Sequence, residues 1–333
     1  MISDRVKSNL RETFGESLLP KLGLVLLTVI LVMAMFAPLL ATHNPTRTGY
    51  FHENGGPYPP PGFDYTTTVA QDGEITQVEV TATDEHLLGT NTIGQDVYSR
   101  FLYGARVSML VGLAGVTLAL LMGVPFGLIA GYYGGRVDDG LMRLADVMLA
   151  FPALVLALAL IGVFGSQPIR VPDPIVWAGF AEGMPESIPI PGSVTIVVAL
   201  VTWVWFARVA RGEALSIRNQ EYVKAAKSFG TPNWKILVTH VLPNSITPII
   251  VLATIQIAVI ILIEASLAYL GFSGTTLSWG YEIETGQDVL RTRPWVAMVP
   301  GIGIVLSVIS VNLLGDWFRD ALDPNIEGSE RGA

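Results

Sequence analysis

Six long runs of apolar residues, separated by polar segments, dominate the pattern of this chain. Each run is close to the roughly 20 residues that an α-helix needs to cross the hydrocarbon core of a bilayer. The runs lie near Leu22–Leu40, Val107–Ala130, Val147–Gly165, Ser193–Ala210, Ser245–Leu270 and Val296–Leu314. The pattern predicts an all-α polytopic membrane protein with six transmembrane helices.

Between the first two runs lies the longest polar segment, Thr42–Tyr103. It contains the Pro/Gly-rich stretch Gly55–Gly62, which does not favour regular helix. Residues 65–83 then form two short strand-like patterns around Asp72 and Gly73, a residue pair favoured in hairpin turns. We therefore expect a small β-hairpin insertion in this segment.

The charge distribution orients the predicted helices. Fourteen of the 20 Lys and Arg residues fall on the same side as the N-terminus, and six fall on the other side. Because an excess of Lys and Arg marks the cytoplasmic side, both termini are predicted to be cytoplasmic. The hairpin and two loops rich in proline and acidic residues, Ser166–Gly192 and Gly271–Trp295, are then extracytoplasmic. The expected location is the cell membrane, with multiple passes.

These elements divide the chain into four parts. Residues 1–41 hold the cytoplasmic N-tail and the first transmembrane helix, and residues 42–103 form the extracytoplasmic segment. Residues 104–315 form the transmembrane core, which includes the polar loop 213–244, and residues 316–333 form the cytoplasmic C-tail. The composition agrees, since 51% of the residues are hydrophobic and only 14% are charged, compared with about 25% charged residues in soluble domains.

The stretch Glu221–Asn244, between the fourth and fifth runs, has the pattern of a polar helical hairpin. In its first half, apolar residues recur at helical spacing, as Tyr222, Ala225, Ala226 and Phe229. Gly230 follows as a helix C-terminal residue that can adopt a positive φ. Such a face favours docking to another protein. The alternative is an amphipathic helix that packs on its own protein or on lipid headgroups.

A second short helix is predicted after this glycine. Thr231 is a favourable N-cap, and Pro232 suits the first helical position. One side of this helix would carry Trp234, Leu237, Val238 and Val241, and the helix is expected to end before Pro243.

Catalytic and metal-binding motifs are not found in the sequence. It has no phosphate-binding G-x-x-x-x-G-K-[ST] loop and no His-Glu-x-x-His motif. It also lacks cysteine, which excludes disulfides and Cys-ligated metals. The four histidines, His43, His52, His86 and His240, are scattered, and the three in outer loops are expected to be solvated. We therefore predict no catalytic, cofactor or metal site in this chain.

Polar residues within the predicted spans are candidates for a translocation pathway. Glu264 is a carboxyl group in an otherwise apolar run, where such groups are costly and commonly functional. It could line a pathway, pair with Arg106 or stay protonated against a neighbouring helix. Asn312 is a weaker candidate, with hydrogen bonding between helices as the alternative.

Other polar and special residues have simpler explanations. Snorkelling to headgroups accounts for Arg208 and Arg211. Asp138, Asp139 and Asp146 would be the nearest candidates for a membrane-embedded enzyme, although a solvated loop explains them as well. The glycines at 123, 127, 131, 134 and 135 are expected to permit close helix packing, and the prolines at 125 and 152 to bend their helices.

The polar loop resembles the coupling loop of ABC-importer membrane subunits. The residues that carry the resemblance stand at that family's spacing and are Lys224, Ala225, Ala226, Gly230, His240, Leu242 and Pro243. Lys224 replaces the usual acid and His240 the usual apolar residue, while Glu221 supplies an acid three positions earlier. The resemblance implies that Glu221, Tyr222, Phe229 and their neighbours in this loop contact an ATPase.

Further stretches resemble the C-type membrane subunit of dipeptide and oligopeptide ABC importers. They are His86–Leu113, in which Asn91 and Gln95 depart from the usual Asp and Arg, then Gly131–Pro152, the run from Glu264, and Asn312–Pro324. The resemblance implies a permease subunit that forms half of the translocation pathway for peptides. Oligosaccharides, nickel complexes or glutathione are alternative cargoes.

The resemblance also implies the partners. They would be a second homologous permease subunit in a heterodimer, two cytoplasmic ATPase subunits that bind ATP and magnesium, and an extracytoplasmic solute-binding protein. The chain itself would bind no cofactor and no nucleic acid. A self-sufficient secondary transporter is the alternative from another class. It would require ionisable residues in several spans, and Glu264 is the clearest of them here.

Overall fold

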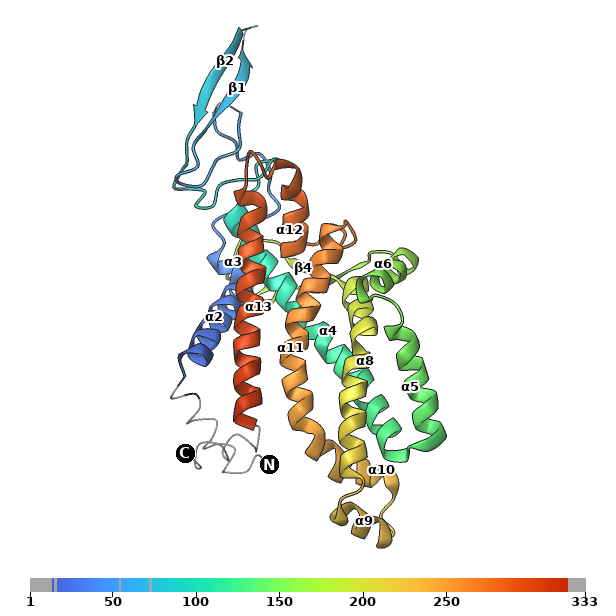
Figure 1. The fold of residues 1–333 in the computed structure, drawn as a ribbon. Coiled ribbons are helices and arrows are strands. Elements are labelled where there is room, and N and C mark those ends of the chain that lie inside the picture. Colours follow the sequence, from blue (N-terminus) through green and yellow to red (C-terminus); the bar gives the residue numbers. More distant parts are fainter. Residues whose placement is uncertain (1–13, 15–16, 54, 72–73, 323–333) are drawn as a thin grey trace, which may run out of the picture.

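The computed structural model describes residues 14, 17–53, 55–71 and 74–322. Five helices in this part of the chain are long and apolar enough to cross a membrane. They are α2 (Leu18–Met35), α4 (Val97–Tyr133), α8 (Gly192–Ile217), α11 (Leu242–Tyr269) and α13 (Trp295–Leu322). α4 crosses the bundle obliquely and packs most extensively on α8, while α11 lies between α8 and α13 (Figure 1).

The predicted third span is not a single straight helix. Its sequence is divided between the end of α5 (Gly135–Leu149) and α6 (Ala153–Phe164), which meet at an angle of 89°. Pro152 lies at the break, and proline disfavours helical conformation in the residue before it. With 12 residues, α6 alone would span only about 18 Å, less than the bilayer core. A sixth crossing therefore exists only if this bent pair is counted as one.

A row of glycines explains the close packing of α4 on α8, as predicted for three of the five glycines. The prediction was wrong for Gly134 and Gly135, where the chain turns from α4 into α5 and no helix backbone lies close. A Cβ atom on Gly123 would overlap the carbonyl oxygen of Trp203, and one on Gly127 would overlap that of Ala207. Gly131 faces the backbone of Arg211 in the same way. Because these glycines recur every fourth residue, they lie on one face of α4 and bring the two backbones into contact.

One end of the bundle carries the predicted hairpin. After the short helix α3 (Ala37–Leu40), strands β1 (Tyr65–Gln71) and β2 (Glu74–Val80) pair antiparallel, with Tyr65 opposite Val80. They project beyond the helices (Figure 1). The expected turn at Asp72 and Gly73 lies outside the described residues.

The other two loops at this end are also structured, which the sequence did not predict. The first holds an antiparallel pair, β3 (Pro168–Pro172) and β4 (Ser187–Pro191), and the short helix α7 (Pro174–Trp177). The second holds α12 (Trp279–Gly286) followed by the 3-10 turn η2 (Gln287–Val289).

Trp279 anchors α12 in the bundle. Its side chain is fully buried, its indole N–H donates to the carbonyl of Phe101 at 3.0 Å, and its ring stacks on the Phe101 ring. Gly104 on α4 and Gly303 on α13 leave the space that this indole fills. The helix α12 thus joins α4 to α13 at the hairpin end.

The opposite end of the bundle carries the predicted polar loop, here called the docking loop (residues 221–244) (Figure 1). Helix α9 (Glu221–Ser228) is followed by Gly230 at φ 79° and then by α10 (Asn233–Ile236). The capping prediction was one residue early, because Pro232 is the N-cap of α10.

The second helix of the docking loop does not end before Pro243. It continues through a π-helical turn, η1 (Leu237–Val241), directly into α11, so that Asn233–Tyr269 forms one helical rod. Such a turn accommodates the missing N–H of proline. The side-chain amide of Asn244 also donates to the carbonyl of His240 at 2.6 Å.

Candidate functional sites at the two ends of the bundle

The docking loop displays large apolar side chains to the surroundings. Phe229 is 89% exposed, Trp234 is 66% exposed, and Tyr222 and Val238 are about half exposed. Val223 and Ile236, on the inner side of the same short helices, are buried. The loop is therefore folded onto the bundle through one face and leaves an aromatic face uncovered in this chain.

The structure brings most of the predicted docking residues to this surface. Ala225 and Gly230 are exposed beside Phe229, as are Glu221 and Lys224, whose side chains pair at 3.1 Å. Ala226 instead turns partly inward and packs on the core. Pro243 is exposed and Leu242 is half-buried where the loop enters α11.

Contacts to the end of α4 hold the docking loop and the residues just before it in place. The guanidinium of Arg218 donates to the carbonyls of Gly131 and Tyr132, at 2.9 and 3.3 Å. The hydroxyl of Tyr132 donates to the side-chain oxygen of Asn233 at 2.9 Å. These contacts join residues about 90 to 100 positions apart in the sequence, and sequence analysis did not find them.

At the hairpin end, two buried ion pairs join the loops to α4. Arg100 makes a bidentate contact with Glu282 of α12, at 2.8 and 2.6 Å, and donates to the carbonyl of Pro45 at 2.9 Å. Arg106 pairs with Asp173, the N-cap of α7. The suggested pairing of Arg106 with Glu264 was therefore wrong.

Glu264 is fully buried in α11, a helix that packs against both α4 and α12. Neither of its carboxyl oxygens makes a hydrogen bond of ordinary geometry within the described residues, although the hydroxyls of Ser108 and Ser278 are its polar neighbours. Asn312 is exposed on α13. Gly315, three residues after Asn312, lies against Thr254 of α11. Thr254 precedes Glu264 by ten residues, so Asn312 and Glu264 lie at different heights along the two helices. The two pathway candidates are thus not brought together within one chain.

The acidic cluster near α5 forms ion pairs with α8. Arg211 contacts Asp138 through two bonds, one of them at 2.7 Å, and Arg208 contacts Asp146 at 2.8 Å. These pairs replace the snorkelling explanation for the arginines and the solvated-loop explanation for Asp138, which is buried, whereas the side chain of Asp146 remains 62% exposed.

Two of the four histidines are brought together, against the prediction that they are scattered and solvated. His86 is buried, and its ring lies 4.5 Å from that of His43, centroid to centroid. Burial lowers the pKa of His43, and the neighbouring His86 lowers it further. Burial alone would raise the pKa of Asp96, but hydrogen bonds from His86 and Ser99 hold it below its ordinary value.

Turn chemistry explains why sequence analysis missed this cluster. Gly89 and Gly94, at φ 72° and 71°, reverse the chain between His86 and Asp96, so that Thr90 pairs with Asp96 across the turn. Two glycines in a polar stretch just before a predicted helix were the available signal. No sequence pattern near His43 indicated that it would lie beside His86 and Asp96.

Comparisons with known proteins agree on one family. The family described as "Binding-protein-dependent transport system inner membrane component" matches residues 123–328, and "N-terminal TM domain of oligopeptide transport permease C" matches residues 19–61. The dipeptide transport system permease protein of Alkalihalophilus pseudofirmus is 33% identical, over 95% of this chain and 90% of that protein. The oligopeptide transport system permease protein of Bacillus subtilis is 31% identical, over 94% and 88%.

A third relative, the glutathione transport system permease protein of Pectobacterium atrosepticum, is 35% identical over 73% of each chain. Among solved structures, an inward-facing MetNI methionine ABC transporter matches 67% of this chain and 97% of its own, with a TM-score of 0.51 and 14% identity. This likeness concerns the fold. The family match over most of the helical bundle, together with relatives that are more than 30% identical over nearly the whole chain, shows that the chain belongs to the family of binding-protein-dependent transport system inner membrane components.

Proposed function

We propose that this chain forms half of a translocation pathway for peptides in an ATP-driven importer. The observation that carries the proposal is the docking loop, whose aromatic face is exposed although the rest of the loop is packed and hydrogen-bonded to the bundle. The names of the dipeptide and oligopeptide permease relatives support peptides as the cargo. Glutathione is the second candidate, since it is named for a relative of 35% identity.

Lys and Arg asymmetry supports an orientation in which the docking loop and both termini are cytoplasmic. The hairpin β1–β2 lies at the opposite end of the bundle (Figure 1) and is then extracytoplasmic, on the side of a solute-binding protein. The other partners proposed are a second homologous permease subunit, which would complete the pathway, and two cytoplasmic ATPase subunits. Those ATPases would hold ATP and magnesium, and this chain would hold no cofactor.

The coupling role rests on the rigidity of the docking loop. ATPase subunits that bind Tyr222, Ala225 and Phe229 would move α9, which is joined to α8 by three residues. They would also move the rod Asn233–Tyr269, in which Trp234 and Glu264 are separated by 30 residues, or about 45 Å of helix. Motion at the docking loop can thereby bias the other end of the bundle between two states.

Replacing Phe229 by alanine is expected to weaken binding of the ATPase subunits by about 2 kcal/mol, because an exposed aromatic at the centre of a docking face acts as a hot spot. The measurement is the amount of ATPase subunit that co-purifies with the chain from its native membrane in mild detergent. Phe180→Ala is the matched control, since Phe180 is 74% exposed in the loop between β3 and β4, at the other end of the molecule. Equal ATPase recovery with both variants would rule out the proposed docking role.

Glu264→Gln is expected to reduce transport while leaving assembly with the partner subunits intact. The amide has nearly the same shape as the buried carboxyl group, which forms no ion pair or hydrogen bond with the described residues, so the bundle should stay folded. Loss of the ionisable group should matter only if the pathway uses it. The measurement is peptide uptake into proteoliposomes that contain the assembled complex. Unchanged uptake would make Glu264 a packing residue and leave the pathway to other side chains, Asn312 among them.

A further inference from the structure

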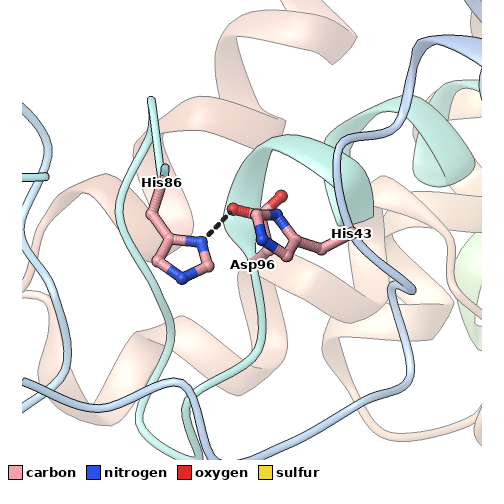
Figure 2. Close-up of side chains that lie close together, drawn as sticks. All are labelled: His43, His86 and Asp96. Atoms are coloured by element: carbon pink, nitrogen blue, oxygen red, sulfur yellow. Dashed lines mark hydrogen bonds and ion pairs between the residues drawn. The ribbon is translucent and has the colours of Figure 1, made fainter. Parts of the chain in front are cut away.

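His43, His86 and Asp96 form a compact cluster at the hairpin end of the bundle. Each of them offers one ligand atom, and these atoms all lie within 4.8 Å of one another. Figure 2 shows the three side chains close together, with a ring nitrogen of His86 directed at the Asp96 carboxyl group. That nitrogen lies 2.8 Å from Oδ1 of Asp96.

The three residues come from three separate segments of the chain. His43 follows α3, His86 lies in the polar segment after the hairpin, and Asp96 is the N-cap of α4. Their positions are fixed by the local structure. The carboxylate of Asp96 accepts from the Ser99 backbone N–H at 2.7 Å, and the Ser99 hydroxyl in turn accepts from the His43 backbone N–H at 3.1 Å.

Burial and ring packing preorganise the cluster for binding a ligand. His86 and Asp96 are 1% and 0% exposed, whereas His43 is only partly buried and gives access from outside. The rings of Tyr50 and Tyr58 pack against His86, at 4.9 and 5.4 Å between centroids, and restrict its rotation. Little side-chain freedom therefore remains to be lost when a ligand binds.

The donor set has a clear chemical preference. Two imidazole nitrogens and one carboxylate oxygen are ligands that Zn²⁺ and similar divalent transition ions bind, whereas Mg²⁺ and Ca²⁺ prefer oxygen ligands alone. Three protein ligands leave a fourth tetrahedral position for water. In the described part of the chain the single hydrogen bond of each ring is made through Nδ1, by His86 to Asp96 and by His43 with the Thr42 hydroxyl at 3.0 Å.

We propose that His43, His86 and Asp96 bind one divalent transition-metal ion, with Zn²⁺ as the expected occupant. The ion would take the place of the proton shared by His86 and Asp96, and His43 would complete the set of protein ligands. It would fasten the segment after α3 and the segment before α4 to the N-terminus of α4. Because the polar segment of residues 42–96 has little hydrophobic core of its own, such a clamp would order it.

The test is zinc binding to the full chain, purified in mild detergent with a tag that lacks histidine. After treatment with a chelator and dialysis, Zn²⁺ is added, and the bound metal is counted by mass spectrometry across a titration. We expect one zinc ion per chain in the unaltered protein. The variants His43→Gln and His86→Asn should bind at least about 100-fold more weakly, since the loss of even an outer-shell contact costs 10- to 100-fold. The amide of the second variant can still donate to Asp96.

His52→Gln is the matched control, because His52 lies in the same polar segment but outside the cluster. It should bind zinc like the unaltered chain, and zinc should raise the unfolding temperature of both. Tetrahedral Co²⁺, detected by its visible absorption, should follow the same pattern across the variants. Absence of stoichiometric binding, or equal binding by all variants, would overturn the proposal. If His86→Asn fails to fold, His43→Gln alone decides, because its side chain is partly exposed.

Discussion

Replacing Arg100 by methionine is expected to destabilise the folded chain by about 3–5 kcal/mol, since it leaves the buried carboxylate of Glu282 without its partner. The two side chains are 4% and 5% exposed, so water cannot take over the lost hydrogen bonds. The variant would also lose the bond to the carbonyl of Pro45 and with it the attachment of α12 and the polar segment to α4. The measurement is thermal unfolding of the detergent-purified chain.

Arg208→Met is the matched control for this experiment. Its partner, Asp146, is also an acid at ion-pair distance, but the two side chains are 46% and 62% exposed. Exposed pairs of this kind contribute about 0–1 kcal/mol. A second test replaces both Arg100 and Glu282 by apolar residues, which should recover much of the stability because no charge stays buried alone. Equal unfolding temperatures for the two single variants would contradict the role assigned to Arg100.

A second large effect is expected for Gly127→Ala in α4. The new methyl group would overlap the carbonyl oxygen and backbone of Ala207 in α8, and backbone cannot move aside as a flexible side chain can. The two helices would have to separate along their contact, at a cost of about 1–3 kcal/mol or more. We expect a lower unfolding temperature and a smaller yield of monodisperse protein in size-exclusion chromatography.

Gly212→Ala in α8 separates this clash from the general effect of replacing a helical glycine. Nothing lies within 4 Å of the position that its Cβ would occupy. Alanine should therefore be neutral or stabilising there, by up to about 1 kcal/mol through helix propensity. If Gly127→Ala behaves like Gly212→Ala, the close approach of α4 to α8 does not depend on that glycine.

Local pattern by itself determined the membrane-spanning character of the chain and the docking loop. Apolar runs of membrane-crossing length need no partner to be recognised, because the bilayer requires them of any spanning helix. Gly230 was predicted at a positive φ from its place after a helical face, and the structure has it at 79°. The strands on either side of Asp72 and Gly73 followed from turn chemistry and alternation in the same way. All of these features depend on residues that are near one another in the sequence.

Only the tertiary structure decided which distant residues meet. It showed that the third apolar run bends by 89° at Pro152 and that the second helix of the docking loop continues into α11. It paired Arg100 with Glu282, 182 residues away, and brought His43 beside His86 and Asp96. Spacing along the chain carries no record of such contacts, because they depend on how whole helices pack. The attraction between two opposite charges is strongest where burial excludes water, and burial is a property of the assembled bundle.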